Sequence, residues 1–222
     1  MTTPLLSAIA TLIWKDLRAE LRSRELVSAM ALFTLLSVLV FSFALSLDRS
    51  ARRELVSGVL WVTLLFASIL GLNRSLAGER EQGSMDAMLI APIDRTAIYL
   101  GKFVANYLFI VAMGVLLLPM MTVFYNINMT QPLMILTLLL GAFGLSALGT
   151  LLATMTVQTR TRETLLPIVM LPTALPILLT VVNASSGILM DEVEPTWFIT
   201  LMVVDALFLA LGILLFEYVV ED

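Results

Sequence analysis

The side chains that carry out most enzymatic and metal chemistry are rare in this sequence. It contains no histidine and no cysteine among its 222 residues. A histidine general base, a thiolate nucleophile and the usual zinc ligands are therefore excluded. One acidic residue, Asp205, lies well inside a long apolar run, where a carboxyl group normally faces a polar interior or a partner. The sequence leaves two readings of Asp205 open, a proton or substrate role and a structural hydrogen bond to a neighbour such as Asn183.

A second group of polar residues lies between about 78 and 95, and we call this segment the coupling region. Gly83 is suited to end one helix in a left-handed conformation, and Ser84 is suited to cap a short helix that stops before Pro92. Asp94 is suited to cap the helix after that. A short helix between two capped breaks is what a rigid docking element needs, and an ordinary connecting loop is the alternative. The candidate docking residues are Arg80, Glu81, Gly83, Ser84, Asp86, Met88, Leu89 and Pro92.

A third group combines charges with spaced prolines. Each proline removes a backbone donor and clashes with the carbonyl four residues earlier, which membrane proteins tolerate where neighbouring helices or water satisfy the freed group. The pattern indicates a hinge or a cavity-lining helix, and a static kink is the alternative. The residues are Arg160, Arg162 and Glu163 in a polar loop, followed by Pro167, Pro172 and Pro176 in an apolar run.

Six apolar runs must position these groups. Each is near the length of about 20 residues that a helix needs to cross a bilayer. Because lipid offers the backbone no hydrogen-bond partners, each run must form a helix. Hydrophobic residues make up 59% of the chain and charged residues 14%. We therefore expect an all-α membrane protein in which residues 1–222 form a single transmembrane domain. The predicted crossings are about 26–47, 55–77, 103–124, 133–157, 165–183 and 197–220.

The segment from about 3 to 24 has helical amphipathicity. Leucines and isoleucines recur at helical spacing, while charges such as Lys15, Asp16 and Glu20 occupy most of the other face. This pattern predicts an N-terminal amphipathic helix in the membrane interface. A solvated approach to the first crossing is the alternative.

Basic residues indicate the orientation. With the N-terminus inside, the outside segments carry only Arg49, Arg52 and Arg53 of the 13 basic residues. Because inside loops are enriched in Lys and Arg, this distribution favours both termini in the cytoplasm.

Two long motifs resemble a known family. The pattern Arg80-Glu81-x-Gly83-Ser84-x-Asp86-x-Met88-Leu89-x-x-Pro92 resembles the cytoplasmic coupling region of ABC exporter permeases of the ABC-2 type, and in particular the haem exporter protein B (CcmB) family of cytochrome c maturation. The stretch 159–179, with its paired basic residues, acid and spaced prolines, is similar to the same family. Shorter matches occur at 58–61 and 136–141, so the resemblance covers most of the chain.

The resemblance implies a six-helix ABC-2-type permease without its own ATPase. Consistent with this, no Gly-x-x-x-x-Gly-Lys-Ser/Thr motif occurs, because Gly101-Lys102 is preceded by Thr96 and followed by Phe103. ATP and Mg would be bound by a partner ATPase, CcmA, which docks on the coupling helix. The other implied partners are CcmC, CcmD, the haem chaperone CcmE, a second copy of the chain and the lipid bilayer of the bacterial inner membrane, with no nucleic acid.

The resemblance leaves the mechanism open. The complex is expected either to export haem or to use ATP to release a haem-loaded chaperone. Export of another substrate such as a lipid or drug, and a non-transporting scaffold, are the alternatives. Haem is a possible substrate of the complex, but we expect no cofactor to be bound by this chain, since only its 13 Met and 4 Tyr could ligate haem iron.

Overall fold

The computed structural model describes residues 5–44, 49–81, 93–156 and 162–221. Of the predicted site residues, Gly83, Ser84, Asp86, Met88, Leu89, Pro92 and Arg160 lie outside this part of the chain. Almost all described residues are helical. The helices are α1 (Leu5–Ser23), α2 (Glu25–Ala44), α3 (Arg49–Glu81), α5 (Arg95–Tyr125), α6 (Pro132–Thr156), α7 (Arg162–Thr173), α8 (Leu175–Leu189) and α9 (Pro195–Glu221).

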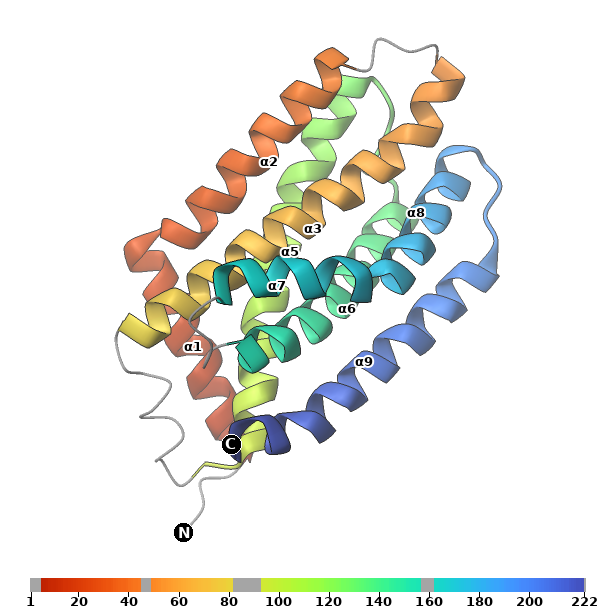
Figure 1. Cartoon of the computed structure of the whole chain (residues 1–222). Coiled ribbons are helices and arrows are strands. Elements are labelled where there is room, and N and C mark those ends of the chain that lie inside the picture. Colours follow the sequence, from red (N-terminus) through yellow and green to blue (C-terminus); the bar gives the residue numbers. More distant parts are fainter. Residues whose placement is uncertain (1–4, 45–48, 82–92, 157–161, 222) are drawn as a thin grey trace.

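The long helices run side by side in one bundle (Figure 1). Five of them, α2, α3, α5, α6 and α9, are long and apolar enough to cross a membrane, and the bent pair α7 and α8 makes a sixth candidate crossing. The start of α1 and the end of α9 lie at the lower end in Figure 1, and the α5–α6 and α8–α9 connections lie at the upper end. The prediction of an all-α membrane fold is confirmed.

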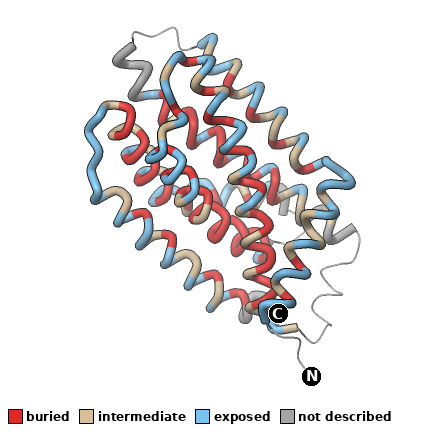
Figure 2. The backbone as a smooth tube through the Cα atoms, turned by 180° about the vertical axis from the view of Figure 1, so that it is seen from behind, coloured by how far each residue is buried: buried red, intermediate tan, exposed pale blue. Residues whose placement is uncertain are grey.

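Burial divides the bundle into a centre and a periphery. α3 and α6 bury most of their residues, whereas α2 and α9 bury few of theirs (Figure 2). In a membrane protein the exposed apolar faces contact lipid or other chains, so exposure of leucine and phenylalanine on α2 and α9 is expected.

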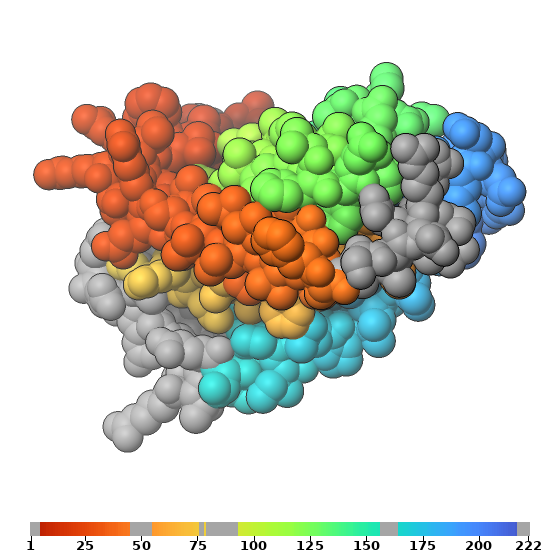
Figure 3. Space-filling model, turned by 90° about the horizontal axis from the view of Figure 1, so that it is seen from above, coloured from red at the N-terminus to blue at the C-terminus, as the bar shows by residue number. Residues whose placement is uncertain are grey.

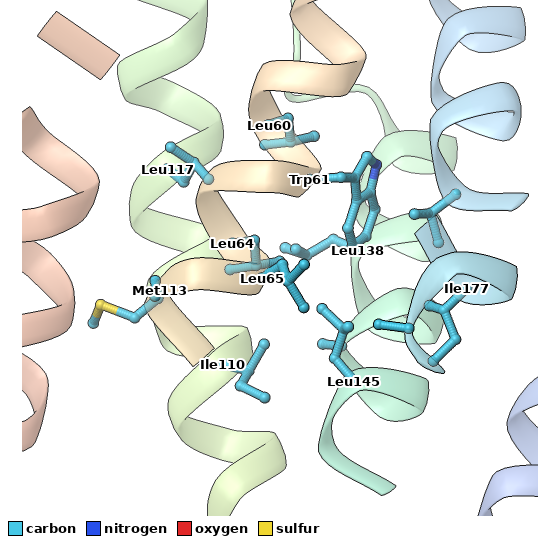
Figure 4. Packing of buried hydrophobic residues seen from close by; sticks show 14 of the residues in the cluster. Leu60, Trp61, Leu64, Leu65, Ile110, Met113, Leu117, Leu138, Leu145 and Ile177 are labelled. Atoms are coloured by element: carbon cyan, nitrogen blue, oxygen red, sulfur yellow. The ribbon is translucent and has the colours of Figure 1, made fainter. Parts of the chain in front are cut away.

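The core packs around Trp61 of α3 (Figure 4). Its indole N–H donates a hydrogen bond of 2.8 Å to Ser185 Oγ on α8. A Cβ on Gly141 of α6 would overlap the Trp61 ring, so the glycine allows α6 to approach α3 this closely. Trp61 thereby joins three helices. The buried side chains around it include Leu60, Leu64, Leu65, Leu138, Leu145 and Ile177.

A sharp turn at Arg24 separates α1 from α2. Arg24 has a φ of 57°, in the left-handed region, and its N–H donates to the Glu20 carbonyl at 2.7 Å. The Glu20 carboxylate then accepts hydrogen bonds from the N–H groups of Leu26 (3.3 Å) and Val27 (2.8 Å), at the start of α2. Glu20 therefore caps the first membrane helix, a role that its expected place on a solvated face did not suggest.

The predicted fifth crossing at 165–183 is not one continuous helix. α7 and α8 meet at Ala174 and are bent by 56°. The reason is Pro176 in the first turn of α8. It has no N–H to donate to the Pro172 carbonyl, and its ring would clash with that carbonyl in a regular helix. The crossing is therefore made of two shorter helices.

Candidate functional site: the coupling end and a buried aspartate

The described residues bracket the coupling region on both sides. α3 continues through Arg80 and Glu81, well past the length of a crossing, as expected from the sequence. On the other side, Asp94 Oδ1 accepts a hydrogen bond of 2.9 Å from the Thr96 N–H. This confirms the prediction that Asp94 caps the following helix. We call the last turns of α3, the first turns of α5 and the packed α1 the coupling end of the bundle.

At this end α1 is fastened to α5 by a buried ion pair. Lys102 Nζ lies 2.8 Å from Asp16 Oδ2, and the side chains of Lys102 and Asp16 are only 6% and 12% exposed. One turn along α1, Leu12 packs against Gly101, where a Cβ would come within 2.8 Å of the Leu12 Cβ. Asp16, which the amphipathic pattern placed on a solvated face, therefore faces the bundle. The two paired residues are 86 positions apart, so no local pattern signals the contact.

A small hydrophobic cluster extends this packing to α6 and α9. Tyr99 of α5 is fully buried and donates a hydrogen bond of 3.0 Å to the Ala147 carbonyl of α6. The Tyr99 ring lies 5.6 Å from the ring of Phe216 on α9. The start of α5 is thus held by α1, α6 and α9 together. The cluster consists of Leu12, Ile98, Tyr99, Leu151 and Phe216.

Asp205 lies halfway along α9 and faces α6. The residue is 3% exposed, and a Cβ on Gly144 would overlap its Oδ1 atom. Neither carboxyl oxygen of Asp205 has a hydrogen-bond partner among the described residues.

The alternative of a structural hydrogen bond between Asp205 and Asn183 is wrong. Asn183 is exposed, and its side-chain amide donates to the Leu179 carbonyl of its own helix at 2.7 Å. The depths also differ. Asn183 is six residues before the end of α8, about 9 Å, whereas Asp205 is ten residues after the start of α9, about 15 Å.

A buried carboxyl group without a donor costs stability, so the position of Asp205 is energetically unfavourable. Ionisable groups inside membrane bundles are commonly functional. Asp205 therefore keeps its status as a candidate for a proton or substrate role. Within the described part of the chain no cluster of three or more acidic, histidine or cysteine residues could hold a metal ion.

Two threonines beside the helix break bond back to carbonyls of their own helices, a contact that often bends a helix. The Thr173 hydroxyl donates to the Val169 carbonyl at 2.7 Å, and the Thr180 hydroxyl donates to the Pro176 carbonyl at 2.6 Å. Pro167 and Pro172 lie inside α7, and Arg162 and Glu163 begin that helix. The bend is thus built into the fold, while a hinge role for it stays a prediction.

Comparison with known proteins identifies the family of this chain. The family described as "CcmB protein" matches residues 7–218. Heme exporter protein B of Rhodobacter capsulatus is 31% identical over 169 residues, which cover 76% of this chain and 78% of that protein. The protein of the same name in Pseudomonas aeruginosa is 29% identical over 159 residues, 71% of either chain. That of Bradyrhizobium diazoefficiens is 27% identical over 190 residues, 85% of this chain and 86% of that protein. The family match covers nearly the whole bundle, and the chain therefore belongs to the CcmB protein family.

Proposed function

We propose that this chain is the permease subunit of an ABC transporter complex that handles haem in cytochrome c-type biogenesis. The observation that carries the proposal is the family match over residues 7–218, in a chain whose described part contains five helices long and apolar enough to cross a membrane. The similar proteins are named heme exporter protein B. An exporter of lipids or drugs and a scaffold are the competing functions.

Energy for the proposed transport comes from another chain. The sequence contains no phosphate-binding Gly-x-x-x-x-Gly-Lys-Ser/Thr motif, so ATP and Mg belong on a partner ATPase, CcmA by family resemblance. A second copy of the permease, CcmC, CcmD and the haem chaperone CcmE complete the proposed assembly in the bacterial inner membrane.

The geometry of the coupling end supports a transmission role. The proposed docking segment connects the end of α3 to the capped start of α5, and the start of α5 is packed against α1, α6 and α9. A force applied between Glu81 and Asp94 would therefore move several helices at once. This arrangement favours ATP-driven movement of the bundle over independent motion of one loop.

Mutation of the docking segment tests the transmission step. Gly83→Val blocks the left-handed turn expected from the sequence, and Asp86→Arg reverses a charge. Both variants should insert normally but abolish cytochrome c maturation in a strain that lacks its own copy. Gly78→Val is the matched control, because a Cβ at Gly78 meets nothing within 4 Å. Normal maturation with both docking variants would show that the segment is only a connector. Normal maturation in a strain without any copy of the chain would contradict the proposed function and favour the competing ones.

Haem binding separates export from chaperone release. This chain has neither His nor Cys, the usual strong ligands of haem iron, so we propose that it supplies motion and that other chains ligate the haem. The absorption spectrum of haem added to the purified permease–ATPase pair should show no stoichiometric six-coordinate species. Such a species, lost on mutation of one Met or Tyr, would favour direct export instead.

The proposed orientation places both termini in the cytoplasm. Because the chain has no native cysteine, single cysteines at Ser84, Thr161, Asn128 and Glu192 report the side of each loop. An impermeant thiol reagent added to intact cells should label positions 128 and 192 only. Labelling of position 84 would contradict the docking proposal.

A further inference from the structure

An apolar groove lies between the first turns of α6 and α9. Its volume is about 400 Å³, and all of its accessible lining is apolar. In Figure 3, which views this end of the bundle, the green α5–α6 turn lies next to the blue start of α9. The two helices line the groove with Leu133, Leu136 and Leu140 of α6 and with Phe198, Ile199 and Met202 of α9.

The lining residues recur at helical spacing on both walls. On α6 they are three and seven residues after Leu133, and on α9 the last is four residues after Phe198. Each wall is therefore a ridge of side chains along a helix axis. A furrow between two such ridges accepts the apolar stripe of a third helix.

The α8–α9 loop closes the end of the groove and carries an acidic rim. Val193 of this loop and Pro195 at the start of α9 line the groove, while Asp191, Glu192 and Glu194 are exposed beside them. No ion pair joins these three carboxylates to any residue that the structure describes. The sequence contains no Lys or Arg after Arg162.

The rim is held in a defined position. The Glu192 N–H donates to the Gly187 carbonyl at 2.8 Å, and the Met190 N–H donates to the Ser186 carbonyl at 3.0 Å. Asp191 adopts the left-handed conformation, with a φ of 61°, that reverses the chain there. The carboxylates are thus presented at the groove by backbone hydrogen bonds to the end of α8.

The charge at its rim determines whether a lipid or a transmembrane helix fits this groove better. Within lipid, apolar surface alone gives no preference for a helix over an acyl chain, so selectivity must come from packing and from charge. The acidic rim repels the phosphate of a lipid headgroup and attracts the side chain of Lys or Arg. We infer that this groove seats a transmembrane helix of a partner chain that carries Lys or Arg at its end beside the α8–α9 loop. The groove lies at the opposite end of α9 from the coupling end, so this inference can fail without the proposed function failing.

The test uses the purified chain in phosphatidylcholine vesicles with Met202→Cys as its single cysteine. It is mixed with a synthetic Leu/Ala helix of about 20 residues, long enough to span the bilayer, that bears one cysteine at matching depth. One version of the peptide ends in three lysines and the other in three glutamates, with the opposite end uncharged. Disulfide yield after oxidation should be about five-fold higher for the lysine peptide, as expected if the rim contributes about 1 kcal/mol.

Two variants decide the outcome. Replacing the rim with Asp191→Asn, Glu192→Gln and Glu194→Gln should abolish the preference for lysine. Val40→Cys is exposed on α2, the helix that Arg49, Arg52 and Arg53 follow in the sequence, and it should show no preference for the lysine peptide. Equal yields at position 202 with the native rim would overturn the inference and leave lipid as the occupant. The same preference at position 40 as at 202 would also overturn it, because the attraction would then belong to the whole surface.

Discussion

Buried polar groups have hydrogen-bond or ion-pair partners at the coupling end, whereas the one at the α6–α9 contact has none among the described residues. At the coupling end, Lys102 meets the Asp16 carboxylate at 2.8 Å, and the Glu20 carboxylate caps α2. At the α6–α9 contact, the Asp205 carboxyl is as deeply buried but has no donor among the described residues. The first region is satisfied and tightly packed, whereas the second retains an unfavourable group.

This contrast indicates that the coupling end holds a fixed arrangement of helices, whereas the α6–α9 contact keeps a carboxyl group for a functional role. A satisfied polar contact specifies one arrangement of helices. An unsatisfied carboxyl lowers stability and is retained where another state of the protein uses it. We therefore expect substitutions in the two regions to separate stability from activity.

Breaking the Asp16–Lys102 pair should have the largest effect on stability. Asp16→Ala removes the nearest opposite charge of the buried Lys102 and should lower the free energy of unfolding by about 3–5 kcal/mol. Unfolding by denaturing detergent, followed by far-ultraviolet circular dichroism, measures the change. The double variant Asp16→Leu with Lys102→Met removes both charges and should recover most of the loss. A double variant as unstable as the single one would show that packing, rather than charge, holds α1.

Asp205→Leu should raise the stability of the protein rather than lower it. Leucine has nearly the shape of aspartate and needs no donor, so the free energy of unfolding should rise by about 1–3 kcal/mol. Cytochrome c maturation should fall in the same variant if the carboxyl has a role. Asp205→Asn serves as the control that keeps a polar group of the same size. A less stable leucine variant would reveal a partner of Asp205 in the assembled complex.

Two glycines sharpen the comparison of packing. A Cβ at Gly101 would press on the Leu12 Cβ, which cannot rotate away, so Gly101→Ala should cost about 1–3 kcal/mol of unfolding free energy. The atoms nearest to a Cβ at Gly144 belong to the Asp205 carboxylate and the Ile177 side chain, which can rotate, so Gly144→Ala should cost less. Gly58→Ala is the control. Nothing lies within 4 Å of its Cβ, and the change should stabilise α3 by about 0.5–1 kcal/mol. An equal cost at Gly101 and Gly144 would contradict the difference in packing.

Removal of the α2 cap should have the smallest effect. Glu20→Ala leaves the N–H groups of Leu26 and Val27 without their carboxylate and should cost about 1 kcal/mol of unfolding free energy. Arg18→Ala, on the exposed face of α1, is the matched control and should be nearly neutral. The same denaturation measurement applies. A neutral Glu20 variant would mean that water caps α2 equally well.

Local features of this protein could be predicted from its sequence, since they depend on neighbours along the chain. The lengths of the apolar runs predicted the membrane helices, Asp94 was recognised as a helix cap, and the spaced prolines predicted a distorted crossing. Each of these follows from backbone hydrogen bonding within a few residues.

The contacts between distant helices could not be predicted in this way. Asp16 and Lys102 each fit a solvated face or a loop, and only the packing of α1 against α5 brings them together. The same limit applies to Asp205, for which Asn183 was suggested as one possible partner but lies at another depth and faces outward. The groove between α6 and α9 likewise arises from two helices whose lining residues are about 60 positions apart.

The bend at Ala174 has a consequence for the thickness of the surrounding bilayer. α8 has 15 residues and α7 has 12, so they are about 22 and 18 Å long. Because α7 is inclined by 56°, it adds only about 10 Å along the α8 axis, and the pair reaches about 32 Å. This barely exceeds a hydrocarbon layer of about 30 Å, whereas α9, with 27 residues, reaches about 40 Å. A thicker bilayer therefore favours a straighter α7–α8 pair, which makes the angle at Ala174 sensitive to lipid chain length.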